Sequence, residues 1–119
     1  ELLSSGYSFV SYPLRVVIRL YPRGEKDFPA RIAVSVSKRR FKRAVKRNRV
    51  KRLIRETYRL NKNILYSYIP EDKTMDILFI YLHDEIFEYG KIEKAITGAI
   101  KKIRSYIEKD SGGDIADTH

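Results

Sequence analysis

The side chains of this chain best placed to do chemistry are twelve basic residues crowded into the 22 residues 38–59. They are Lys38, Arg39, Arg40, Lys42, Arg43, Lys46, Arg47, Arg49, Lys51, Arg52, Arg55 and Arg59. Glu56 is the only acidic residue among them, so the segment carries a net charge of +11, whereas the other 97 residues hold 13 basic and 14 acidic side chains. Such a density of like charge destabilises a fold by self-repulsion and favours a polyanionic partner. The expected chemistry is binding of anionic groups, for which Arg offers a planar, bidentate donor.

The basic segment has a helical pattern that extends to about Leu65, before Pro70. One stripe with a period of 3.6 residues is apolar except at two positions and comprises Val50, Leu53, Ile54, Thr57, Asn61 and Ile64. A second stripe, roughly opposite, comprises Asn48, Arg52, Arg55 and Arg59, with Arg47, Arg49 and Lys51 on its flanks. The pattern predicts a helix that packs one face and presents guanidinium groups on the other.

Three roles are compatible with such a helix. A solvated face usually mixes charges, with Glu four residues before Lys or Arg, and here only Glu56 offers a partner. A membrane-surface helix carries Trp, Phe or Leu bulk, whereas this apolar stripe has the size that a sheet would cover. Nucleic acid is therefore the favoured partner, and the residues alone leave RNA and DNA open. Asn48 is a candidate for hydrogen bonding a base edge or a 2′-hydroxyl, and Tyr21 is a candidate for base stacking.

The sequence does not indicate a catalytic or metal site within the chain. Metal-dependent phosphodiester hydrolysis needs carboxylates gathered around one or two ions, whereas the acidic residues here lie in turns or near helix starts. His83 and His119 stand alone, and the chain has no Cys to complete a ligand set or to form a disulfide. We therefore expect no catalytic residue and no metal ligand.

Two strands are predicted before the basic helix. Alternating apolar residues mark them at 14–21 and 31–37, and a turn at 22–27 joins them. One face of the second strand is small, polar and open to a ligand, because it carries Ala33, Ser35 and Ser37. The open face of these strands is thus a second candidate binding surface.

The rest of the chain completes a small α+β domain. A nearly all-apolar strand is predicted at 76–82 and an amphipathic helix at 89–107, with a short strand at 7–12 as an option and a disordered tail from Ser111. The 119 residues suffice for one domain with helices on one side of the sheet. No apolar run approaches the roughly 20 residues that a membrane span requires.

Two adjacent motifs stand out where the second strand ends and the basic helix begins. The strand ends Val34-Ser35-Val36-Ser37-Lys38, and the helix carries Ala44-Val45-Lys46-Arg47-Asn48-Arg49-Val50-Lys51-Arg52-Leu53-Ile54-Arg55-Glu56. Over essentially residues 6–109 the chain resembles the bacterial ribonuclease P protein subunit. The resemblance implies an α+β two-layer sandwich with the order α-β-β-β-α-β-α and a left-handed βαβ crossover, the first helix being largely absent here. It also implies one RNA-binding domain over 1–110 and a disordered tail at 111–119.

The function that the resemblance implies is that of a protein subunit of a ribonucleoprotein. Such a subunit assembles with a catalytic RNA, and the holoenzyme is an endoribonuclease that removes the 5′ leader from precursor tRNA. The RNA, with bound Mg²⁺, performs the hydrolysis. The implied RNA contacts are Lys38, Arg47, Asn48, Arg49, Lys51, Arg52, Arg55 and Arg59. The implied leader cleft, between the basic helix and the sheet face, comprises Arg15, Val17, Arg19, Ser35 and Ser37.

The chain departs from the family pattern at three places. Only the end of the family's first helix, near Leu2-Leu3, is represented, Val17 replaces a common aromatic residue of the cleft, and Arg39-Arg40-Phe41-Lys42-Arg43 replaces a shorter, Gly-containing connection. The alternative function is that of a ribosomal or assembly protein that binds structured RNA without processing it. We expect a monomer in a 1:1 complex with RNA, a cytoplasmic location, no membrane partner and no cofactor required by the protein itself.

Overall fold

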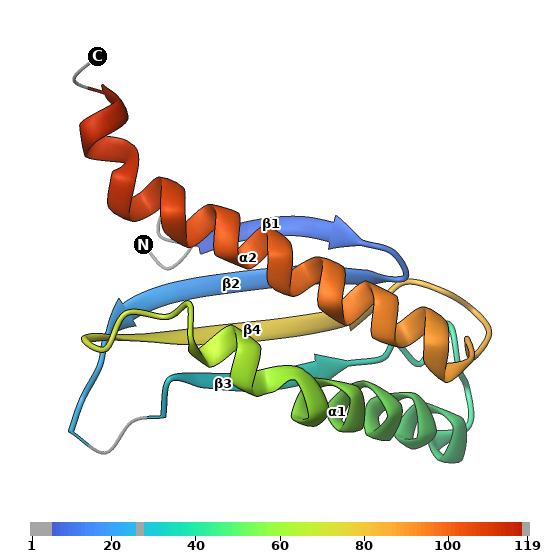
Figure 1. Ribbon diagram of the computed structural model, residues 1–119. Helices are drawn as coiled ribbons and strands as arrows, with labels where there is room; N and C mark the ends of the chain where they lie inside the picture. Colours follow the sequence, from blue (N-terminus) through green and yellow to red (C-terminus); the bar gives the residue numbers. More distant parts are fainter. Residues whose placement is uncertain (1–5, 26–27, 118–119) are drawn as a thin grey trace.

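Four strands form one mixed sheet, and both helices cover the same face of it (Figure 1). The computed structural model describes residues 6–25 and 28–117, with side chains described as far as Lys109. The elements are β1 (Gly6–Ser11), β2 (Leu14–Pro22), β3 (Ala30–Ser35), α1 (Ala44–Tyr66), β4 (Lys73–Tyr81) and α2 (Tyr89–Asp117). The predicted α+β layer pair is confirmed, and the optional strand near residues 7–12 is present as β1. The family's first helix would fall at residues 1–5, outside the described residues.

The strands lie in the order β1-β2-β4-β3, so the apolar β4 is central, as its composition predicts. β1 pairs with β2, and β2 with β4, in antiparallel fashion, whereas β3 and β4 are parallel. The helix α1 connects these two parallel strands. In Figure 1 it lies in front of the sheet, both strands run the same way and β4 lies above β3, which makes the crossover left-handed. Since nearly all such crossovers are right-handed, only the family resemblance predicted this feature.

The core lies between the sheet and the two helices. Strand alternation sends Leu14, Val16 and Ile18 of β2 toward the helices, and all three are fully buried. The same face of β4 is closed by Met75, Ile77, Phe79 and Tyr81, and α2 packs against it with Ile92, Ile96, Ala99 and Ile103. Because the helices occupy this face, no helix of the described residues covers the other face of the sheet.

The buried stripe of α1 differs from the predicted one at its end. Val50, Ile54 and Thr57 are buried as expected, but Ile64 is 53% exposed, and Leu65 is buried in its place. A helix turns by about 100° per residue. Measured from Val50, the buried residues Ile54, Tyr58 and Leu65 lie at about 40°, 80° and 60°, so the buried face is centred on that side, whereas Ile64 lies at about −40°. The two polar positions of the stripe bond within the helix, because Thr57 Oγ1 donates to the Leu53 carbonyl at 2.7 Å and Asn61 Nδ2 donates to that of Thr57 at 2.8 Å.

The connection from β3 to α1 is a tight turn. The strand ends at Ser35, two residues before its predicted end, because the amides of Arg40 and Phe41 both donate to the Ser37 carbonyl, at 3.2 and 3.1 Å. Phe41 is 5% exposed and packs beside Tyr81, with ring centroids 6.0 Å apart. This one aromatic residue anchors the otherwise basic connection in the core.

The last helix is longer than the sequence predicts. The predicted helix ends near Ile107 and gives way to a disordered tail at Ser111, whereas the structure continues α2 to Asp117. Once a helix is nucleated, each further residue adds a hydrogen bond without needing a tertiary contact. Residues 118–119 lie outside the described part of the chain. Within that part, no helix is both long enough and apolar enough to cross a bilayer.

Candidate nucleic-acid interface

The outer side of α1 presents a shallow groove, here called the helix groove. It is lined by the predicted second stripe, the flanking Lys51 and also Glu56, so that the full set is Asn48, Lys51, Arg52, Arg55, Glu56 and Arg59. All of these side chains are exposed except that of Lys51, which is half-buried. Arg52 and Arg55 make no hydrogen bond or ion pair with any described residue. Their guanidinium groups are therefore free to bind an external anion.

Glu56 occupies one end of this cationic array. Arg59 Nη2 donates to Glu56 Oε2 at 2.6 Å, one helical turn away. This hydrogen bond and the charge of Arg59 lower the pKa of Glu56, and the same pair raises the pKa of Arg59. Both side chains are more than half exposed, so water screens the pair. The pair leaves the groove with a net positive charge.

Arg47 has a structural partner as well as an accessible surface. Its Nη1 donates to the carbonyls of Phe41 at 2.8 Å and Lys42 at 3.0 Å, which ties the helix start to the preceding turn. The helix has neither a side-chain cap at Arg43 nor an acidic residue in its first turn. Arg47 thus orders the basic connection, a role that the sequence did not predict.

The other predicted RNA contacts lie around the helix start. Lys38 and Arg49 are exposed. Arg40 Nη1, in the same connection, forms an ion pair with Asp84 Oδ1 at 2.9 Å, which joins this turn to the segment after β4. These cations extend the positive surface from the helix groove toward the end of β3.

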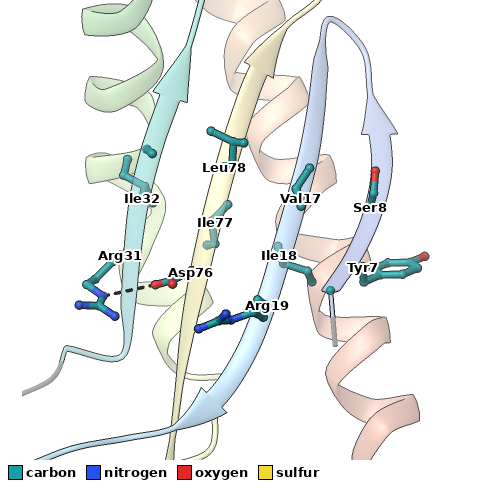
Figure 2. A pocket seen from close by; sticks show the side chains of 12 residues that line it. Tyr7, Ser8, Val17, Ile18, Arg19, Arg31, Ile32, Asp76, Ile77 and Leu78 are labelled. Atoms are coloured by element: carbon teal, nitrogen blue, oxygen red, sulfur yellow. Dashed lines mark hydrogen bonds and ion pairs between the residues drawn. The ribbon is translucent and has the colours of Figure 1, made fainter. Parts of the chain in front are cut away.

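The uncovered face of the sheet contains a depression, here called the sheet hollow, of about 630 Å³ (Figure 2). Outward-pointing side chains of three strands form its floor, namely Val17 of β2, Leu78 of β4 and Ala33 of β3, which pair across the sheet in one row. In Figure 2 the helices lie behind the strands. The sheet hollow therefore has an apolar floor and opens away from both helices.

One end of the sheet hollow carries charge. Arg19 and Arg31 both pair with Asp76 across the sheet, and Arg31 Nε lies 3.3 Å from Asp76 Oδ1. The Tyr21 hydroxyl donates to the same oxygen at 2.9 Å and also contacts Arg31 Nη2. The guanidinium groups of Arg19 and Arg31 lie over the Tyr21 ring, 4.8 and 5.6 Å from its centroid. Tyr21 therefore already stacks with these two groups of the protein.

The predicted leader-cleft residues divide into two groups. Val17 and Arg19 line the sheet hollow. Arg15 is exposed beside it and donates to Ser8 Oγ at 3.2 Å, Ser35 is exposed at the end of β3, and Ser37 Oγ accepts a hydrogen bond from the Arg39 amide at 2.9 Å. The sequence missed Arg31, Asp76 and Leu78. Alternation along β3 and β4 places them on the open face, but only the strand order brings them to Arg19.

The predicted cleft between the basic helix and the sheet face is corrected by the structure. No residue of α1 lines the sheet hollow, and no strand residue lines the helix groove. The reason is that α1 packs its apolar stripe on the opposite face of the sheet. The chain therefore has two separate candidate surfaces, joined around the end of β3 by Ser35, Ser37 and Lys38.

Acidic and histidine side chains do not gather anywhere in the described residues. No group of three or more His, Cys, Asp or Glu in these residues is placed to hold a metal ion. His83 Nδ1 lies 2.9 Å from the Tyr12 hydroxyl, and its ring stacks on Phe87 at 4.2 Å.

Comparison with known proteins identifies the type of polyanion. Residues 1–104 match the family model described as Ribonuclease P. The ribonuclease P protein component of Porphyromonas gingivalis is 43% identical over 103 residues, covering 86% of this chain and 74% of that protein. The chain belongs to the ribonuclease P protein family. A second component, from Chlorobaculum tepidum, is 43% identical over 70 residues, covering 59% of this chain and 43% of that protein.

Solved structures agree on the fold. The ribonuclease P protein from Thermotoga maritima matches with a TM-score of 0.62 and 23% identity, covering 85% of this chain and 86% of that one. The protein from Staphylococcus aureus matches with a TM-score of 0.62 and 24% identity, covering 86% and 84%. As a ribonuclease P protein component, the chain is the RNA-binding partner of the ribonuclease P RNA and takes part in tRNA processing by the holoenzyme. Membership in this family identifies the nucleic acid as RNA, a choice that the basic residues left open.

Proposed function

We propose that the helix groove binds the ribonuclease P RNA and that the sheet hollow binds the single-stranded 5′ leader of precursor tRNA, in a 1:1 complex of protein and RNA in the cytoplasm. The observation that carries the proposal is the presence of two separate exposed surfaces with different chemistry. One is a row of cations on a rigid helix, and the other is a concave apolar floor with cations at one end. These surfaces suit a folded RNA and an unstacked strand, respectively.

The helix groove fits RNA where phosphates converge. Arg52 and Arg55 are fixed on a helix whose opposite side is buried, so their guanidinium groups are presented without reorganisation of the fold. Arg forms bidentate hydrogen bonds with phosphate. Each phosphate neutralised releases counterions, which makes assembly weaken as salt is raised. Asn48 adds an amide that can bond a base edge or a 2′-hydroxyl between the cations.

The sheet hollow fits a single strand. Unpaired bases bind proteins by contact of their faces with apolar or aromatic surfaces, while the backbone follows positive charge. Val17, Ala33 and Leu78 supply the apolar surface, and Arg15 and Arg19 supply charge on the same strand as Val17. A duplex has its bases stacked inside and cannot use such a floor. The geometry therefore favours the leader over the folded body of the tRNA.

We assign the hydrolysis to the RNA with its Mg²⁺. This assignment is supported by the described residues, among which no group of three or more His, Cys, Asp or Glu could hold a metal ion. The role of this chain is to bind both RNAs, to orient the leader and to neutralise phosphates where the two RNAs meet. Because repulsion between phosphates is strongest when few cations are present, the protein should matter most at low Mg²⁺.

The test is cleavage of precursor tRNA by an in vitro transcript of the ribonuclease P RNA at low Mg²⁺, with and without the full chain. We expect the chain to raise the rate, and the Arg52→Ala/Arg55→Ala variant to raise it less. Arg104→Ala is the matched control, since Arg104 is an exposed helical arginine on α2 away from both surfaces. An unchanged rate on adding the chain, or an equal loss with Arg104→Ala, would contradict the proposal.

The leader contact is tested separately. Arg19→Ala should weaken binding of the assembled holoenzyme to precursor tRNA but leave its binding to mature tRNA, which has no leader, unchanged. Equal effects on the binding of precursor and mature tRNA would contradict leader binding in the sheet hollow.

A further inference from the structure

The connection between β3 and α1, residues 38–43, concentrates positive charge at one end of the sheet and is here called the basic connection. Five of its six residues are basic, and the sixth, Phe41, is buried. The helix that follows has no acidic residue in its first turn to offset this charge. Like charges at this density repel one another, so the basic connection favours an anionic ligand. Its exposed cations, which form no hydrogen bond or ion pair with any described residue, are Lys38, Arg39, Lys42 and Arg43.

The first half of the basic connection is held in one shape by the protein itself. The Ser37 carbonyl accepts hydrogen bonds from the amides of Arg40 and Phe41 at 3.2 and 3.1 Å. Arg40 Nη1 lies 2.9 Å from Asp84 Oδ1, in the segment that leads from β4 into α2 (Figure 1). The Phe41 side chain is 5% exposed and anchors the turn in the core. None of these contacts reaches the side chains of residues 42–43, which need a different support.

Arg47 provides that support. Its Nη1 donates to the carbonyls of Phe41 at 2.8 Å and Lys42 at 3.0 Å. Its amide donates to the Arg43 carbonyl at 3.2 Å. Arg47 is half-buried, whereas the residue on either side of it is exposed. A guanidinium that donates to two carbonyls fixes the backbone that carries them, so loss of Arg47 should release residues 42–43 while the buried stripe of α1 keeps the helix in place.

We propose that the basic connection is a third RNA-binding surface, which contacts backbone phosphates, and that Arg47 is the positioning residue that presents its cations Lys42 and Arg43. Cations that are already ordered bind with a smaller loss of conformational entropy. Because Phe41 is buried, the basic connection exposes no aromatic ring to stack on a base, and its cations suit phosphates. The inference rests on the proposed binding of the ribonuclease P RNA to the helix groove, which begins one helical turn further along α1.

The test is titration of an in vitro transcript of the ribonuclease P RNA with the full chain at several salt concentrations. Lys42→Ala/Arg43→Ala should lower the slope of log affinity against log salt by about 1.4–1.8, the loss of two phosphate contacts. Arg47→Ala should lower the slope by a similar amount, although it removes only one charge. Arg49→Ala is the matched comparison, because Arg49 is exposed in the same helical turn and has no partner among the described residues. It should lower the slope by only about 0.7–0.9.

Combining the substitutions separates positioning from direct contact. Residues that act through one another have non-additive effects, whereas independent residues have additive ones. Arg47→Ala should therefore lower the slope little further when Lys42 and Arg43 are already alanine. Arg49→Ala should lower the slope by its full amount in the same background.

Amide hydrogen exchange shows whether the change in Arg47→Ala is local. The Phe41 amide, which donates to the Ser37 carbonyl, should exchange roughly tenfold faster because the turn loses a charged hydrogen-bond donor. The amide of Ile77, a core residue of the central β4, should keep the protection that it has in the wild type. Equal loss of protection at both amides would mean that Arg47 supports the whole fold, which overturns the positioning role.

Each other failure has its own pattern. An unchanged salt slope for Lys42→Ala/Arg43→Ala overturns the basic connection as an RNA-binding surface, and this variant changes only exposed side chains. Additive losses from Arg47→Ala and Lys42→Ala/Arg43→Ala overturn the positioning role. Failure of the proposed function looks different, because Arg52→Ala/Arg55→Ala would then also keep the wild-type salt slope. Failure of this inference alone leaves the lowered slope of that variant intact.

Discussion

Ile54 and Arg55, neighbours in α1, provide the sharpest test of which face of the helix stabilises the fold and which face binds RNA. Ile54 is completely buried, whereas Arg55 is exposed in the helix groove. Alanine at each position keeps the helix, since alanine has the highest helix propensity. The two substitutions should therefore have opposite profiles in stability and in binding.

The cost of Ile54→Ala follows from its burial. Three buried carbons are removed, worth roughly 0.8 kcal/mol each in transfer free energy. The cavity left between α1 and the sheet adds to this loss, so the free energy of unfolding should fall by about 3–4 kcal/mol. For a domain of this size the melting temperature should drop by roughly 10–15 °C. RNA affinity, measured where the variant is folded, should stay close to that of the wild type.

Arg55→Ala should show the reverse. An exposed substitution changes stability by about 0.5 kcal/mol or less. Loss of one phosphate contact should lower the slope of log affinity against log salt by about 0.7–0.9. Thermal melts and titrations of the ribonuclease P RNA at several salt concentrations measure both quantities. Equal melting temperatures for the two variants, or an unchanged salt slope for Arg55→Ala, would refute the assignment of the two helix faces.

Three further predictions concern single side chains. The buried Tyr58 hydroxyl makes no hydrogen bond of ordinary geometry with a described residue, and burial together with the neighbouring Tyr66 raises its pKa. Tyr58→Phe should therefore leave the free energy of unfolding unchanged or raise it by up to about 1 kcal/mol in urea titrations, and a clear loss would show that the contact with Tyr66 is a stabilising hydrogen bond. The Tyr81 hydroxyl accepts a hydrogen bond from the Phe87 amide and donates one to the Glu85 carbonyl. Tyr81→Phe should therefore lower the free energy of unfolding by about 1–3 kcal/mol and speed amide hydrogen exchange at Phe87. Unchanged exchange at Phe87 would contradict this role of the hydroxyl. Arg59 lowers the pKa of Glu56, so the stabilising effect of this pair should be present above the ordinary glutamate pKa and be lost as pH falls through the lowered value. The melting temperatures of Glu56→Gln and the wild type should therefore converge in acid. A difference in melting temperature that widens in acid would contradict the lowered pKa.

Local patterns in the sequence predicted most of the elements. Strand alternation and helical periodicity depend on residues within a few positions of each other, so β2, α1 and β4 could be placed without knowing how they pack. The charge concentrated in residues 38–59 predicted a polyanion, and the motif around Asn48 pointed to ribonuclease P through its resemblance. Burial at the far end of α1 was misjudged because the buried face of the helix includes Tyr58, which the predicted stripe left out, and is therefore centred nearer to Leu65 than to Ile64.

The sequence by itself determined most of the elements and their types, the cationic face of α1 and the RNA-binding family, because each of these depends on neighbouring residues or on a contiguous motif. Only the tertiary structure decided that Tyr21, Arg31 and Asp76 meet, since strand order and register bring together residues up to 55 positions apart. It also decided that α1 and the sheet hollow lie on opposite faces of the sheet. The physical reason is that a helix must bury its apolar stripe on one face of the sheet, and this burial leaves the other face free for a ligand.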